Sequence, residues 1–211
     1  QKESMIRTLW PRDSLLSYGR LPNGKVMINW PINGNDYYVN AVEQTEEERT
    51  KSFEKAKLKS LQFLYYLQTD LGFNTYGLSK GIFPTADDFP LIPYHRESRR
   101  IRGYTTLTVN HIAQPYEQSK PLYRTGIAVG DYPVDHHHAC HPDAAQLPEI
   151  HFYPVPSYSI PMGCLIPENI DNFIVAEKSI SVTNIANGTT RLQPVVMQIG
   201  EAAGVMAALS I

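Results

Sequence analysis

The sequence has no long hydrophobic run, few cysteines and no excess of charge of one sign. None of its apolar stretches approaches the roughly 20 residues that a membrane-spanning helix requires. Only two cysteines occur, Cys140 and Cys164, so a disulfide framework does not hold the fold together. The formal net charge of −2 gives no reason to expect nucleic acid or a membrane as a partner. The composition is that of a globular protein.

Several signatures of enzyme chemistry are also missing. The sequence contains no G-x-G-x-x-G dinucleotide fingerprint, no P-loop, no G-x-S-x-G turn and no H-E-x-x-H. Its first residues, Gln-Lys-Glu-Ser, include neither an initiator Met nor the apolar core of a signal peptide. This start indicates either a cut inside a longer protein or a mature end after processing. A cytoplasmic and an exported location both stay open.

The patterns that are present predict an α+β fold. Thr45 and Glu48 form a capping box ahead of apolar residues at helical spacing, which predicts one long helix of about 25 residues. Strands are expected over residues 102–112 and 125–129. Residues 131–161 are polar and rich in proline and histidine, so we expect mostly loop there. The sheet is predicted to be mixed or antiparallel, with many loops around it.

The last fifty residues have a different character. Residues 172–176 are a short apolar run of the kind that forms a buried strand. Residues 191–209 are predicted to form a helix. Its later part is rich in Gly and Ala, and such small residues let a helix lie close to a sheet or a ligand. A Gly-containing loop, Asn187–Arg191, leads directly into that helix. Unpaired N–H groups at a helix start suit a phosphate or an electron-rich ring.

A histidine-rich run, Asp135–His141, carries possible acid–base or metal chemistry. Zinc uses these ligand types, but adjacent side chains diverge and no spaced partner such as H-x-x-x-H occurs, so we predict no metal site. As substrate-facing acid–base groups we name His137, His138 and Tyr132. The alternative is that the histidines are ordinary packed or solvated side chains.

An arginine-rich run spans Arg96–Gly103. It is either a solvated charge run or an anion contact, because a guanidinium offers fixed, bidentate donors. If it is functional, Arg99 and Arg100 are the residues expected to orient a polar or anionic substrate.

Three C-terminal motifs, taken in order, carry a family resemblance. Cys164–Ser181, Asn187–Arg191 and Gly200–Gly204 closely resemble the end of a bacterial family of FAD-dependent oxidoreductases related to the glutathione-reductase-like flavoproteins. That family's pattern is a strand with V-A-G-R-x-x-S, then G-S-x-R, then a G-x-A-A-G helix. Upstream segments that resemble the same family are Gly34–Tyr38, Arg96–Ile101 and Ala128–Pro133. The sequence departs from the pattern in having Glu177-Lys178 for Gly-Arg and Thr189 for Ser.

The resemblance implies FAD as cofactor and an FAD-binding domain that is split in sequence. Residues 1–160 would be the substrate or cap domain, and residues 161–211 the returning strand and helix of the FAD domain. The chain would then lack the N-terminal G-x-G-x-x-G half, which makes a cut inside a longer protein the favoured interpretation of its start. A small polar substrate, with carbohydrate-related compounds among the candidates, would exchange a hydride with the flavin. The residues implied in flavin contact are Asn187, Gly188, Thr189, Arg191 and Gln193.

Two other functions compete with the redox interpretation. A polysaccharide lyase would use Tyr and His as base and acid, with Arg neutralising a uronate, and aromatic surfaces suit sugar rings. A non-catalytic binding or assembly module is the third candidate. The terminal strand–helix pattern has no role in lyase chemistry, which favours the flavoprotein.

Overall fold

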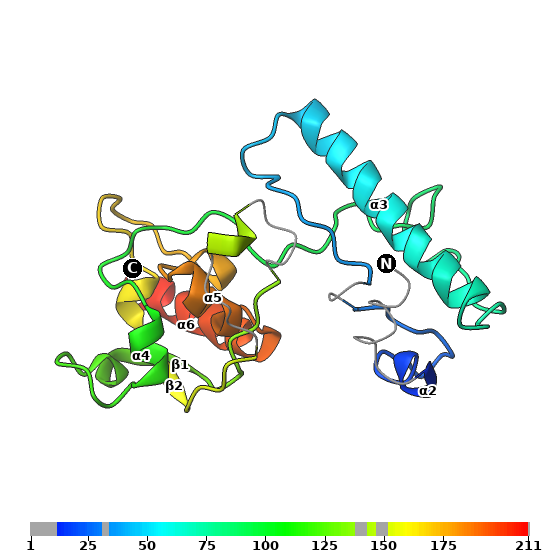
Figure 1. The fold of residues 1–211 in the computed structure, drawn as a ribbon. Helices are drawn as coiled ribbons and strands as arrows, with labels where there is room; N and C mark the ends of the chain where they lie inside the picture. Colours follow the sequence, from blue (N-terminus) through cyan, green and yellow to red (C-terminus); the bar gives the residue numbers. More distant parts are fainter. Residues whose placement is uncertain (1–11, 31–33, 138–142, 147–151, 211) are drawn as a thin grey trace. The chain divides into compact units, whose positions relative to one another are not determined.

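The computed structural model describes residues 12–30, 34–137, 143–146 and 152–210. The chain divides into two compact units, Gln1–Tyr94 with His137–Ala145, and His95–His136 with Gln146–Ile211 (Figure 1). The first unit contains the long helix, and the second contains a small antiparallel sheet with several helices.

The first unit is built on α2 (Arg12–Leu15) and α3 (Glu46–Thr69). The predicted capping box begins α3: the Thr45 N–H donates to Glu48 Oε2 (2.8 Å), and the Glu48 N–H donates to Thr45 Oγ1 (3.3 Å). The Thr45 hydroxyl also donates to Glu48 Oε2 (2.9 Å), and the bonds from the Thr45 N–H and hydroxyl to this carboxylate lower the pKa of Glu48, the backbone N–H having the larger effect. The buried core of this unit is formed by Leu15, Leu16, Phe63 and Leu67.

The second unit contains two antiparallel strands, β1 (Gly126–Gly130) and β2 (Tyr158–Pro161). Its α-helices are α4 (Val109–Ala113), α5 (Asn184–Thr190) and α6 (Gln193–Leu209). The short 3₁₀ helices of the chain are η1 (Leu122–Thr125), η2 (Ala144–Gln146), η3 (Met162–Cys164) and η4 (Glu177–Ser179).

One hydrophobic core joins the strands and helices of the second unit. Val195 and Ile199 bring one face of α6 into this core, and Ile160 brings in the inner face of β2. The Gln198 side chain bridges α6 to β1, since its Oε1 accepts from the Val129 N–H (3.0 Å) and its Nε2 donates to the Val129 carbonyl (3.2 Å). The other fully enclosed members are Leu107, Ile112, Val134, Cys164, Leu165, Ile180 and Ala186.

The predicted α+β class and three predicted elements are confirmed. The long helix is α3, the strand expected at 125–129 is β1, and the C-terminal helix is α6. Each of these carries a strong local signal, whether a capping box, a β-rich run or a long apolar repeat.

Three local predictions are wrong. The strand expected at 102–112 is reduced to isolated bridges at Gly103 and Leu107, and α4 begins at Val109. Residues 172–176 form no strand; the Val175 N–H donates to the Leu165 carbonyl (2.9 Å), and a strand needs a ladder of such bonds with a neighbour. The loop expected at Asn187–Arg191 is instead helical up to Thr190, as the end of α5.

No single helix in the described ranges is long and apolar enough to cross a membrane. Only α5 and α6 taken together reach that length and composition, and they are bent by 94° at their junction.

The predicted division into a substrate or cap domain, residues 1–160, and a part of the FAD domain, residues 161–211, stays a prediction.

Candidate functional site

The corner between α5 and α6 gathers most of the predicted cofactor residues (Figure 1). Thr183 caps α5, because its Oγ1 accepts from the Ala186 N–H (3.5 Å). The chain turns at Leu192, whose backbone is extended, and α6 then begins at Gln193 with Pro194 in its first turn. The Leu192 side chain has no oxygen, so it cannot accept a hydrogen bond from the first N–H groups of α6.

Asn187, on α5, is the most unusual polar residue of this corner. Its side chain is fully buried, and neither Oδ1 nor Nδ2 forms a hydrogen bond within the described part of the chain. A buried amide without partners costs about 1–3 kcal/mol of stability per unsatisfied group. Such exceptions are rare in folded proteins, and each needs an explanation, a functional role being one of them.

Residues 131–136, which we call the strap, run across α5. Thr189 Oγ1 donates to the Tyr132 carbonyl (2.6 Å) and accepts from the Tyr158 hydroxyl (2.8 Å). Burial raises the pKa of Tyr158 to about 12, so its proton stays available for that bond at neutral pH. This chain of hydroxyls fixes the strap against both α5 and β2.

Arg191 ties the strap to the end of α5. Its side chain is only 7% exposed, and its Nη2 donates to both the Asp135 carbonyl (3.1 Å) and Asp135 Oδ2 (3.2 Å). A buried guanidinium needs a counter-charge, and Asp135 provides it.

His136 packs directly on α5. Its Nε2 lies 3.2 Å from the Ile185 carbonyl, which can only accept, so Nε2 carries a proton. Its Nδ1 is 3.9 Å from Glu97 Oε1. A Cβ added at Gly188 would lie 2.9 Å from the His136 ring, so the close approach requires glycine there.

The predicted substrate arginines differ in their surroundings. Arg100 Nη1 donates to Glu97 Oε2 (3.0 Å), and the same oxygen accepts from Asn184 Nδ2 (2.7 Å). Arg100 is therefore linked to α5 through Glu97. Arg99 is exposed, and Gln193 is the exposed first residue of α6.

Among the predicted acid–base groups, Tyr132 lies at this corner. His137 belongs to the first unit, where its Nδ1 lies 3.1 Å from Asp36 Oδ2 and its side chain is 10% exposed. His138 lies outside the described residues. In the part of the chain that the structure describes, no group of three or more His, Cys, Asp or Glu side chains could hold a metal ion.

Several residues of the corner were not predicted, among them Asp135, His136, Glu97 and Tyr158. Asp135 and His136 stand in the histidine-rich run that the sequence singles out, but nothing local distinguishes His136 from His137. Only the packing against Gly188 does so.

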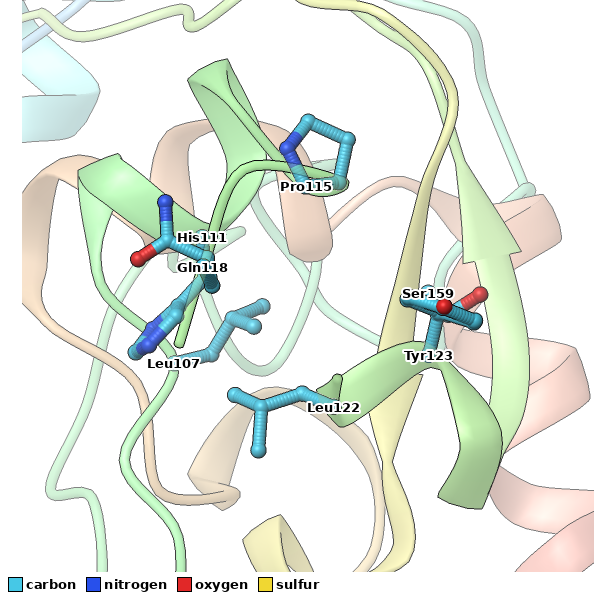
Figure 2. A pocket seen from close by; sticks show the side chains of 7 residues that line it. All are labelled: Leu107, His111, Pro115, Gln118, Leu122, Tyr123 and Ser159. Carbon is cyan, nitrogen blue, oxygen red and sulfur yellow. The ribbon is translucent and has the colours of Figure 1, made fainter. Parts of the chain in front are cut away.

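A small hollow elsewhere in the second unit is lined by Leu107, His111, Pro115, Gln118, Leu122, Tyr123 and Ser159, as Figure 2 shows. Its volume of about 10 Å³ is that of one water molecule, far below the several hundred Å³ of a small-molecule site. His111 Nδ1 accepts from the Thr108 N–H (3.0 Å), so in the neutral ring the proton is on Nε2. This hollow cannot hold a flavin or a substrate.

Comparison with known proteins identifies a family. The family model described as FAD dependent oxidoreductase matches residues 1–211, which is the whole chain. No curated protein matches, and no solved structure does. The chain therefore belongs to the FAD dependent oxidoreductase family, and its cofactor is FAD.

Proposed function

We propose that this chain is the C-terminal part of a glutathione-reductase-like flavoprotein, acting on a small polar substrate by hydride exchange with the flavin. Residues 1–160 serve as substrate or cap domain, and residues 161–211 complete the FAD domain. The family match supports the redox class, and the missing G-x-G-x-x-G motif supports a further segment that binds the pyrophosphate.

The buried amide of Asn187 carries this proposal, because it tests whether the corner fits a flavin. A flavin ring edge alternates hydrogen-bond donors and acceptors, and the Asn187 side chain offers one of each without a partner among the described residues. The first N–H groups of α6 add positive potential with no acidic residue in that turn. The residues present therefore fit the group.

In this proposal each residue of the corner has a distinct task. Asn187 and the first turn of α6, which begins at Gln193, would hold the ring. Gly188 lets the strap approach α5, and Thr189 fixes the strap through Tyr132. When bound, FAD would act as the acceptor of a hydride, which carries the two electrons of the reaction.

Arg191 has hydrogen-bond donors that its contacts with Asp135 do not use, and these could bind the cofactor. Both of its bonds to Asp135 use Nη2, and within the described residues the N–H groups of Nε and Nη1 are left for a ligand. A guanidinium in this position favours the negatively charged reduced flavin.

The open side of α6 supports a further segment of the FAD domain. Apart from the neighbouring backbone of α6 itself, no atom of the described residues lies within 4 Å of a Cβ built at Gly200 or Gly204. Met197 and Leu209 are 74% and 83% exposed on the same helix. A helix that is apolar on most sides is normally buried, so we expect the remainder of the FAD domain to pack here.

For proton transfer and substrate orientation, we propose the residues that were predicted from the sequence. His137, whose Nδ1 lies 3.1 Å from Asp36 Oδ2, is proposed for acid–base work, and His138 and Tyr132 are the alternatives. Arg99, which is exposed, and Arg100 are proposed to orient a polar or anionic substrate.

The visible absorption spectrum of the whole protein, purified without added FAD, tests the proposal first. We expect flavin bands and release of FAD on denaturation. A colourless protein that FAD cannot reconstitute would contradict the redox function and restore the lyase and binding-module alternatives.

A conservative variant tests the residue assignment. Arg191→Lys keeps one ammonium for Asp135 but loses the remaining donors, so we expect FAD affinity to fall about tenfold, the equivalent of one hydrogen bond. Arg124→Lys, at an exposed arginine in η1, is the matched control. Equal affinities for the two variants would remove Arg191 from the flavin site.

A further inference from the structure

The Asp135–Arg191 pair couples the strap to the proposed flavin site. Both side chains are largely buried, with 13% and 7% of their surfaces exposed. Water therefore screens the pair little, and the Asp135 carboxylate strongly offsets the positive potential around Arg191. Within the described ranges, the carboxylate that contacts Arg191 is that of Asp135.

Asp135 itself is held in place from the backbone. Its N–H donates to the Gly188 carbonyl (3.4 Å), and its own carbonyl accepts from Arg191 Nη2. Three residues earlier in the strap, the Tyr132 carbonyl accepts from Thr189. The carboxylate of Asp135 thus has little freedom, and it determines the orientation of the guanidinium.

We infer that Asp135 is a positioning residue, which orients Arg191 and offsets part of its charge, and so lowers the reduction potential of the flavin. The inference rests on the proposed function, which puts Arg191 beside the flavin. Asp135 itself needs no contact with the cofactor, because it acts through Arg191. Its carboxylate keeps the guanidinium from stabilising the reduced flavin fully.

Asp135→Asn in the whole protein with FAD bound is the test. The amide keeps an oxygen that can accept from Nη2, but the negative charge is lost. At a fixed potential we expect the ratio of reduced to oxidised flavin to rise about tenfold, which is about 30 mV for a two-electron couple. Equilibration with a reference dye measures this ratio directly.

Asp131→Asn is the matched control, because Asp131 is an exposed carboxylate of the same strap. It changes the net charge equally, and we expect the wild-type potential. If Asp135→Asn also keeps that potential with FAD bound, the inference is wrong while the proposed function stands. A wild-type protein that binds no FAD refutes both.

A second variant covers the case in which Asp135→Asn fails to fold because Arg191 is left buried without a counter-charge. The double variant Asp135→Asn, Arg191→Gln removes both charges. We expect it to recover thermal stability, which is read without cofactor. If it is no more stable than the single variant, Asp135 does not act through Arg191, and the inference is wrong.

Discussion

Replacing Asn187 by Leu should stabilise the protein and weaken its hold on FAD. Asn187 is fully buried, and its amide has no partner within the residues that the structure describes. Leu has nearly the same shape and carries no polar atoms, so the cost of the unsatisfied amide, about 1–3 kcal/mol, is removed. Leu also has the higher helix propensity, worth about 0.5 kcal/mol in α5.

The assay is thermal unfolding of the cofactor-free protein, followed by circular dichroism. For a chain of this size about 1 kcal/mol raises the melting temperature by about 2–4 °C, so we expect a clear increase. FAD affinity of the same variant should fall about tenfold or more, because Leu can neither donate nor accept. Opposite signs for stability and binding are the mark of a group kept for function.

Asn184→Leu is the matched control on the same helix. Asn184 is exposed and donates to Glu97 Oε2 (2.7 Å), so this variant loses a hydrogen bond and gains no stability. If Asn187→Leu also lowers the melting temperature of the cofactor-free protein, the amide is satisfied in the folded state. It would then be a structural residue, and the case for a flavin at this corner would lose its main support.

Three further predictions concern other parts of the chain. Burial lowers the pKa of His111 from 6.5, so the folded state binds its proton less readily than the unfolded chain. Stability should thus be complete above pH 6.5 and decline as the pH falls, and urea unfolding should show a smaller decline for His111→Gln. Burial raises the pKa of the Cys164 thiol to about 12, so peptide mapping should find it unlabelled by iodoacetamide near pH 9.0 until the protein is denatured. Glu177 has a φ of 64°, in the left-handed region. Glu177→Gly relieves about 1–2 kcal/mol of strain and adds about 0.5–1 kcal/mol of entropy cost, so calorimetry should show a small net stabilisation; a loss of stability would mean that the Glu177 side chain is itself anchored.

Glu177, where the sequence departs from the pattern of the related family, has a left-handed φ. The related pattern has glycine at this position, and glycine adopts that conformation without strain. This chain adopts the left-handed conformation at that position with a glutamate.

Some elements could be predicted because their causes are local. The Thr45–Glu48 capping box and the apolar repeat behind it fix the start of α3 wherever the rest of the chain lies. The strand at 172–176 could not be predicted in the same way. Its apolar run supplies a surface to be buried, but a strand exists only where a neighbour completes its hydrogen bonds.

The sequence by itself determined the long helix, the α+β class, the family and therefore the cofactor, because these depend on local spacing and on motifs in order. Only the tertiary structure decided which polar groups meet. It separated His137 from Tyr132 into different units, paired Arg191 with Asp135 across 56 residues, and left the amide of Asn187 buried without a partner in the described chain. Burial and long-range contacts arise from packing between distant segments, and no local pattern specifies them.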